Sequence, residues 1–347
     1  MSKKVSLFYH GVDLDGYCSA ALIKYFLHYT TLFETDEEVN IQLNPWNYGF
    51  KISKNHYINS DFIFCTDICL DEEQFEQIIV NDEFKTENIY VLDHHETQQK
   101  LVAWLKENRF INAKSVCDIA HSGSYHVYDF IKKNLRKDVP VNILSGLNIF
   151  NFVIDLVDNW DTHNYIHIDD KEYVDTVKKF KAYMAGIESD CSTVEGWENW
   201  KSLIDLAVTN SDSFMAELQN IIAYGTIIKQ SQFNLCNNVV PSFVFDCDFE
   251  GYKMVCLNCI PGLASDYLND CKDFEKYDLI CTFYFCPRSS QWNFSIRKTD
   301  TADEKITLVP IWEKYNKIRS GGHKGAGSIR CNSFKYNAID KSLKLIF

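Results

Sequence analysis

The hydrophobic positions of the first hundred residues fall into short runs separated by polar turns. Continuous apolar runs at 5–10, 61–67 and 88–92 predict strands that are buried on both faces. Helical spacing of apolar residues at 19–27 and 71–80 predicts a helix after each of the first two runs. Strands that alternate with helices are typical of a parallel sheet with crossover helices. The pattern therefore predicts an α/β domain.

The pattern changes after this region. Residues 122–135 and 143–160 have helical spacing, and the stretch from 171 to about 234 is also helical but mixed in polarity. A second block then predicts a smaller α+β domain, with a helix at 264–270 and strands at 239–246, 253–258, 277–285 and 292–296. We expect an α/β domain over 1–190, a helical connector over 191–237 and the α+β domain over 238–347.

Histidines and carboxylates follow the predicted strands of the first domain. His10 ends the first strand and is followed by Asp13 and Asp15, Asp67 ends another strand, and Asp93-His94-His95 follows the next. The carboxyl ends of parallel strands lie on one edge of a sheet, where ligands gather. A set rich in oxygen and imidazole suits Mn²⁺ or Mg²⁺ better than a structural zinc. Each segment alone is also compatible with an ordinary polar turn, so the prediction of a site depends on their convergence.

The composition is that of a soluble globular protein, with 46% hydrophobic and 24% charged residues among 347. No apolar run reaches membrane-spanning length, and no secretory leader precedes the first strand, so we expect no membrane association. Thirteen cysteines, most of them in apolar runs, fit a reducing, cytoplasmic location. Cys256 and Cys259 form an isolated C-x-x-C pair, for which core packing is favoured over a metal or redox role.

Charge is distributed unevenly along the chain. The formal net charge is −13, yet residues 288–347 contain 12 Lys or Arg and only 5 Asp or Glu. An acidic first part suits bound cations, and a basic last part suits an anionic ligand. Uneven charge also occurs on protein surfaces that bind neither. The acidic total disfavours tracking along a long nucleic acid. The chain has no G-x4-G-K-[ST] motif, which disfavours a nucleotide-driven transferase or synthetase.

Taken together, these motifs resemble those of the DHH phosphoesterase superfamily, in the oligoribonuclease and RecJ-like branch that carries a second, DHHA1-type domain. The resemblance covers most of the chain. Its motifs are His10-x2-Asp13-x-Asp15-Gly16, Asp67, Asp93-His94-His95, a later aspartate, Arg297 and Gly321-Gly322-His323-Lys324-x-Ala326-Gly327. The chain departs from the family at Ser320, where a further glycine is expected, and serine is small enough for the loop to survive.

The resemblance implies a role for each motif residue. One divalent ion would be held by His10, Asp13 and Asp67, and a second by Asp15, Asp67, His94 and a late aspartate, with Asp67 bridging both. For that last ligand we favour Asp158, then Asp161, with Asp155 on the helix surface or behind the ligands. His95 would contact the phosphate or donate a proton, and Asp93 would orient its neighbours. Five residues of the second domain would bind substrate phosphate: Arg297, Gly321, Gly322, His323 and Lys324.

The function implied is that of a phosphodiesterase or exonuclease, with two ions, most readily Mn²⁺ and otherwise Mg²⁺, activating a water as nucleophile. A chain of this length lacks the extra nucleic-acid-binding domain of RecJ-type exonucleases, which favours short oligonucleotides or small nucleotides as substrates. Cyclic dinucleotides, a nucleotide bisphosphate and polyphosphate are alternatives on the same scaffold. An inactive scaffold that senses nucleotides is a further alternative, and a homodimer is one possible assembly.

Overall fold

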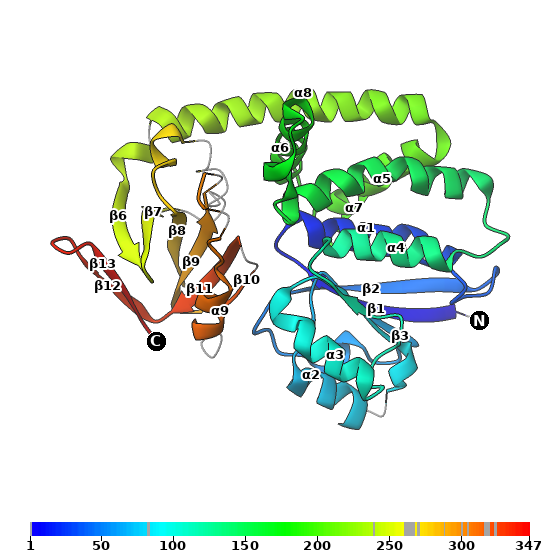
Figure 1. Cartoon of the computed structure of the whole chain (residues 1–347). Helices are drawn as coiled ribbons and strands as arrows, with labels where there is room; N and C mark the ends of the chain where they lie inside the picture. The colour runs from blue at the N-terminus through cyan, green and yellow to red at the C-terminus, as the bar shows by residue number, and fades with distance from the viewer. Residues whose placement is uncertain are drawn as a thin grey trace. The chain divides into compact units, whose positions relative to one another are not determined.

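The computed structural model describes residues 2–81, 84–238, 240–259, 268, 271–287, 289–299, 301–303, 305–315, 320–322 and 325–347. Contacts divide the chain into two compact units, Met1–Ile228 and Lys229–Phe347. The long helix α8 (Ser211–Asn238) spans the boundary in sequence (Figure 1). Most of the expected connector, 191–237, therefore belongs to the first unit.

The first unit contains a parallel sheet, as the apolar runs predict, and this sheet has five strands. Its strands are β1 (Ser2–His10), β2 (Glu38–Trp46), β3 (Phe62–Thr66), β4 (Ile89–Asp93) and β5 (Val116–Cys117). Their order is β2-β1-β3-β4-β5, and all four pairings are parallel. The chain leaves β1 toward one side of the sheet and later adds β3 on the other. In this strand order the opening for a ligand lies beyond the carboxyl ends of β1 and β3.

Helices cover both faces of this sheet (Figure 1). On one face lie α1 (Leu14–Phe26), α4 (Gly123–Asn134) and α5 (Val141–Asp161), and on the other α2 (Glu72–Glu76) and α3 (Gln99–Glu107). The alternation of side chains along β1 assigns Leu7 and Tyr9 to the first core and Phe8 to the second. Because both faces are buried, the strands read as continuous apolar runs.

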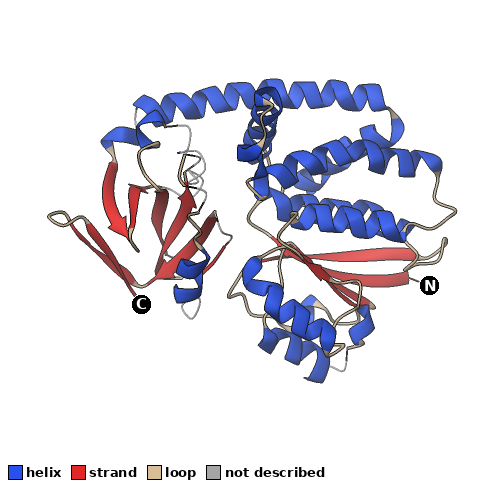
Figure 2. Ribbon diagram, in the orientation of Figure 1, coloured by secondary structure: helices blue, strands red, loops and turns tan. Residues whose placement is uncertain are grey.

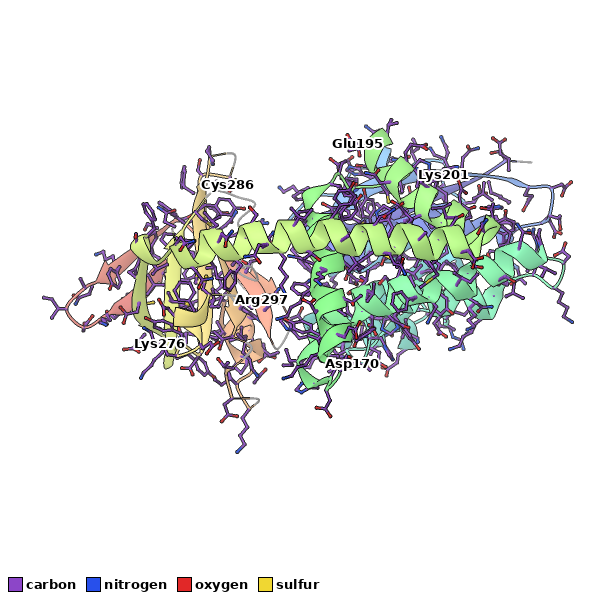
Figure 3. The ribbon with its side chains drawn as sticks, turned by 90° about the horizontal axis from the view of Figure 1, so that it is seen from above. Asp170, Glu195, Lys201, Lys276, Cys286 and Arg297 are labelled. Carbon is purple, nitrogen blue, oxygen red and sulfur yellow. The ribbon has the colours of Figure 1, made fainter. Side chains whose placement is uncertain are left out.

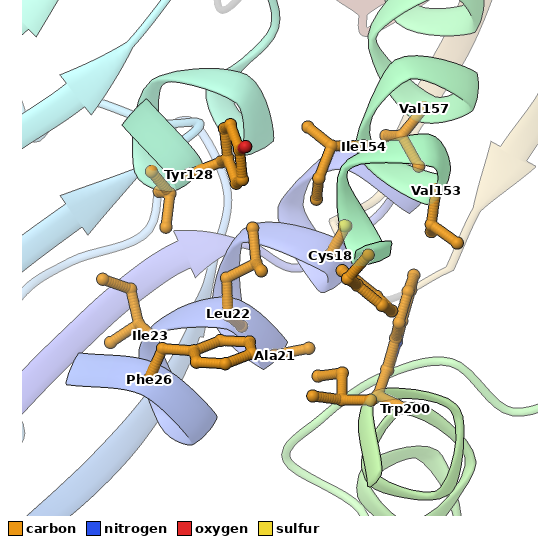
Figure 4. Packing of buried hydrophobic residues seen from close by; sticks show 14 of the residues in the cluster. Cys18, Ala21, Leu22, Ile23, Phe26, Tyr128, Val153, Ile154, Val157 and Trp200 are labelled. Atoms are coloured by element: carbon orange, nitrogen blue, oxygen red, sulfur yellow. The ribbon is translucent and has the colours of Figure 1, made fainter. Parts of the chain in front are cut away.

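Two further helices extend the first core. They are α6 (Lys171–Gly186), capped by Asp170, which accepts from Glu172 N and Tyr173 N (Figure 3), and α7 (Val194–Thr209). Trp200 of α7 is fully buried among residues of α1 and α5 (Figure 4), and its indole N–H donates to Ser189 O at 2.9 Å. This packing explains why α7 belongs to the first unit.

Helix α5 is long and apolar enough to cross a membrane by length and composition alone. Half of its most apolar window is buried inside the protein, and Leu147, Phe150 and Ile154 are fully buried in the first core. The core helix of a soluble protein meets the same length and composition test, so α5 is weak evidence for a membrane span.

The second unit is built on an eight-stranded mixed sheet of order β10-β11-β9-β8-β7-β6-β13-β12 (Figure 2). Its strands are β6 (Val244–Phe249), β7 (Tyr252–Asn258), β8 (Leu279–Cys286), β9 (Gln291–Lys298), β10 (Ser320–Gly322), β11 (Ala326–Cys331), β12 (Ser333–Asn337) and β13 (Ser342–Ile346). The four expected strands correspond to β6–β9. Strands β10–β13 and helix α9 (Val309–Tyr315) were not predicted, and the helix expected at 264–270 lies outside the described residues except for residue 268.

Most of the cysteines that the structure describes are buried. Cys256 is fully buried in the core beneath β7, and Cys259 is half-buried against a different apolar cluster. The C-x-x-C pair is thus divided between two clusters, in agreement with a packing role.

Candidate metal centre

The polar ends of β1, β3 and β4 converge at the carboxyl edge of the first sheet. His10 Nδ1 lies 3.6 Å from Asp67 Oδ2, and His94 Nε2 lies 3.1 Å from Asp67 Oδ1. Asp67 therefore presents one oxygen toward His10 and the other toward His94. All three side chains are buried.

Two groups of side chains in this region have the spacing of metal ligands. The first consists of His10, Asp67 and His95, and the second of Asp15, His94 and Asp161; within each group the ligand atoms lie within 4.8 Å of one another. Five of these six residues are buried and Asp161 is partly buried. Asp67 contacts a member of each group, which is the arrangement expected of a bridging carboxylate.

Asp67 has an unusual backbone conformation. Its φ is +55°, in the left-handed region that non-glycine residues seldom occupy, although aspartate tolerates it better than most. Its backbone N–H donates to Leu92 O at 2.9 Å, which ties the turn after β3 to β4. Strain of this kind costs about 1–3 kcal/mol and clusters at functional sites.

Asp15 is held by the N-terminus of α4. Gly123 N donates to its Oδ2 at 2.7 Å and Ser124 N donates to its Oδ1 at 2.9 Å, so both oxygens are fixed by backbone dipoles. A Cβ on Gly123 would lie 2.5 Å from the Cβ of Asp67 and 3.0 Å from Asp15 Oδ2. Only glycine allows α4 to approach the carboxylates this closely.

Asp13 is placed beside His10 but outside both groups of three. Its Oδ1 caps α1 by accepting from Gly16 N at 3.0 Å, and its Oδ2 lies 2.8 Å from His10 Nδ1. Burial opposes ionisation of Asp13, yet the neighbouring His10 lowers its pKa. Burial likewise disfavours the charged form of His10, but Asp13 raises the pKa of that imidazole. Each of the two side chains therefore favours the charged form of the other.

Asp93 orients the two histidines that follow it. Its Oδ1 accepts from His94 N at 2.8 Å and from His95 Nδ1 at 2.8 Å. These bonds fix the orientation of the His95 ring, and the orienting role that the resemblance implies for Asp93 stays a prediction. His95, expected on the substrate side, is instead brought into the group with His10 and Asp67.

The three acids at the end of α5 have different surroundings. Asp161 Oδ2 lies 3.2 Å from His94 Nε2, whereas Asp158 accepts from Ser122 N at 2.6 Å and from His121 Nδ1 at 2.9 Å. Asp155 accepts from Asn151. The structure thus favours the second choice, Asp161, over Asp158. Residues three apart share a helix face but differ by about 4.5 Å along its axis, and only the last turn reaches His94.

The charge balance of the cluster fits bound cations. Burial, reinforced by neighbouring aspartates, raises the pKa of Asp67 well above its usual range, and the same causes raise the pKa of Asp161. One buried oxygen of each has no hydrogen bond of good geometry among the described residues. Buried carboxylates need a compensating charge or donor. Oxygen and imidazole donors suit divalent ions such as Mn²⁺ or Mg²⁺.

Three of the five residues expected to bind phosphate lie on the second sheet. Arg297 is on β9 (labelled in Figure 3) and pairs with Ala326 of β11, while Gly321 and Gly322 form β10, which pairs with β11 on its other side. One strand therefore separates Arg297 from the glycines. His323 and Lys324 lie outside the described residues.

Three residues near the cluster were missed from the sequence: Gly123, His121 and Tyr48. The half-buried Tyr48 ring lies edge-on to the rings of His10 and His95, with centroids at 6.0 and 5.6 Å. The segment Ser122-Gly123-Ser124 is readable as a helix start, but no local signal shows that this start meets Asp15 and Asp67.

Comparison with known proteins gives structural likenesses only. No protein-family model matches the chain, and no curated protein matches it significantly. Among solved structures, the chain is similar to an uncharacterized protein from Helicobacter pylori G27 (16% identity, 97% of this chain and 95% of that one, TM-score 0.42). It is also similar to the pGpG-specific phosphodiesterase PggH from Vibrio cholerae (14%, 94% and 92%, TM-score 0.44). A third is exonuclease RecJ bound to manganese (13%, 94% and 85%, TM-score 0.46). With TM-scores below 0.5, these likenesses carry no argument about the reaction.

Proposed function

We propose that this protein is a metal-dependent phosphoesterase that hydrolyses phosphodiester bonds in short oligonucleotides or small nucleotides. The observation that carries the proposal is the convergence of two ligand groups at the switch point of a parallel sheet, where Asp67 of the first group lies 3.1 Å from His94 of the second. The non-enzymatic alternative is a nucleotide sensor that uses the same site for binding alone.

The residues at the site have separable roles in this proposal. His10, Asp67 and His95 would hold one divalent ion, and Asp15, His94 and Asp161 the other, with Mn²⁺ favoured and Mg²⁺ the alternative. Two such ions supply a nucleophilic water at neutral pH and neutralise the charge that develops on a phosphoryl group. The chain's own residues fix the geometry: Asp93 orients His95 through Nδ1, and the N-terminus of α4 orients Asp15.

Substrate binding is assigned to the second unit. Arg297 and the β10 glycines would contact a substrate phosphate, since a guanidinium and backbone N–H groups both suit an anion. The excess of Lys and Arg after residue 288 supports an anionic ligand, and the acidic remainder of the chain disfavours a long nucleic acid.

The test is hydrolysis of bis-p-nitrophenyl phosphate and of di- to pentanucleotides by purified protein, with Mn²⁺ and with a chelator. We expect turnover only with the metal. In Asp67→Asn we expect kcat/KM to fall by about 100-fold or more, because removing a metal ligand costs at least as much activity as removing a residue that only orients a ligand. Asp155→Asn is the matched control, since Asp155 contacts Asn151 rather than the cluster. Nucleotide binding without turnover in the metal-loaded wild type would favour the sensor instead.

A further inference from the structure

His121 forms a side-chain pair with a buried carboxylate at the start of α4. Its Nδ1–H donates to Asp158 Oδ2 at 2.9 Å, and the other oxygen of Asp158 accepts from Ser122 N at 2.6 Å. The side chain of Asp158 is only 8% exposed, whereas that of His121 is 40% exposed. Tyr125 stacks on the imidazole with ring centroids 3.7 Å apart. The ring is therefore fixed on one face and at one nitrogen.

This arrangement determines what the other nitrogen can do. In a neutral imidazole, a proton held at Nδ1 by a carboxylate leaves Nε2 as a hydrogen-bond acceptor. No described residue hydrogen-bonds to the Nε2 of His121. In its neutral form, His121 thus offers an oriented, partly exposed acceptor.

The same two elements that build the metal centre also position this acceptor. His121 precedes Gly123 and Ser124, whose N–H groups hold Asp15, and Asp158 is one helical turn before Asp161. His121 therefore lies on the side of the metal-ligand cluster where α4 begins and α5 ends. It belongs to neither ligand group.

Substrate chemistry limits what a neutral Nε2 could contact. Phosphate oxygens accept hydrogen bonds and cannot pair with an acceptor. If a scissile phosphate lies at the cluster, the nearest donors in a nucleotide are the ribose hydroxyls, and the base N–H groups are farther away. The 2′-hydroxyl is also the group that distinguishes RNA from DNA.

We propose that His121, oriented by Asp158, accepts a hydrogen bond from a substrate ribose 2′-hydroxyl and makes the enzyme prefer ribonucleotides to deoxyribonucleotides. The inference rests on the proposed function, since it takes the substrate to be a nucleotide bound by its phosphate at the cluster. Asp158, expected from the sequence to bind a metal, would then serve as the positioning residue for His121.

Nucleotide affinity tests the proposal without turnover. Dissociation constants for AMP and 2′-deoxyAMP would be measured by calorimetry on Mn²⁺-loaded protein, and kcat/KM on the dinucleotides ApA and dApdA. We expect the wild type to favour the ribose form by about fivefold in both measurements, as one net hydrogen bond provides. His121→Asn keeps an N–H near the position of Nδ1 and so can retain the bond to Asp158, but it has no group at Nε2.

His121→Asn and His121→Ala should both reduce the preference to near unity by weakening only the ribose ligands. His28→Asn is the control, because His28 lies beyond the opposite end of α1. If His121 has a purely structural role, His121→Asn will keep the wild-type preference for ribose, and this result would overturn the proposal. A wild type that binds both nucleotides equally, or binds neither, would overturn it as well. A preference in binding that His121→Asn abolishes, with no hydrolysis of either dinucleotide, would uphold the inference and refute the hydrolase function.

Discussion

Gly123→Ala tests how tightly α4 is packed against the carboxylates. An added Cβ would lie 2.5 Å from the Cβ of Asp67, and ordinary contact begins at 3.4 Å, so α4 must retreat by about 0.9 Å. A shift of this size along the bonds would lengthen the 2.7 and 2.9 Å hydrogen bonds to Asp15 beyond 3.5 Å. Overpacking costs about 1–3 kcal/mol, and a lost hydrogen bond to a charged group about as much. We expect the free energy of unfolding to fall by roughly 3 kcal/mol or more.

The assay is urea unfolding of the chelator-treated protein, followed by Mn²⁺ titration of the folded variant. Gly186→Ala is the matched control, since a Cβ at the end of α6 would meet only the flexible end of Ile228, at 3.0 Å. We expect Gly123→Ala to weaken Mn²⁺ binding and Gly186→Ala to leave it unchanged. If the free energy of unfolding of Gly123→Ala lies within about 0.5 kcal/mol of the wild-type value and the variant binds Mn²⁺ normally, then α4 does not approach Asp15 and Asp67 as closely as described.

The remaining predictions concern individual side chains and the metal. Saturating Mn²⁺ at about 100 times its dissociation constant should stabilise the wild type by about 2.7 kcal/mol for each bound ion, seen as a higher Tm, and an unchanged Tm would contradict a metal centre. Asp161→Asn should remove the part of that stabilisation that the second ion supplies, while Asp158→Asn keeps most of the total; the reverse result would restore Asp158 as the ligand. Trp200→Ala should cost about 3–5 kcal/mol in urea unfolding, because the side chain is fully buried, and a loss below 1 kcal/mol would contradict its place in the core. Arg297→Ala should raise KM for oligonucleotides with little effect on bis-p-nitrophenyl phosphate, and equal losses on both would exclude a substrate contact.

The sequence predicts β1, β3 and β4 of the first sheet well because these strands are buried on both faces. Under that condition the strand is a continuous apolar run, and the polar residue that ends it marks the carboxyl edge. His10, Asp67 and Asp93 all occupy that edge in the structure. Strands β12 and β13 were missed because exposed and buried residues alternate in them, so neither forms an apolar run.

The choice among the α5 acids needed tertiary information. Asp155, Asp158 and Asp161 share a helix face, so periodicity cannot rank them, and only the position of His94 selects Asp161. The partner of Asp158 is a histidine 37 residues away, and the partners of Asp15 are backbone N–H groups more than 100 residues away. No local pattern encodes contacts of that separation.

The central claim is that two buried groups of histidines and aspartates bind divalent ions. It is tested most directly by anomalous diffraction at the manganese edge from crystals grown with Mn²⁺. We predict two anomalous peaks per chain, one among His10, Asp67 and His95 and one among Asp15, His94 and Asp161, with Asp67 beside both. No peak at these residues in crystals soaked with saturating Mn²⁺ would contradict the claim.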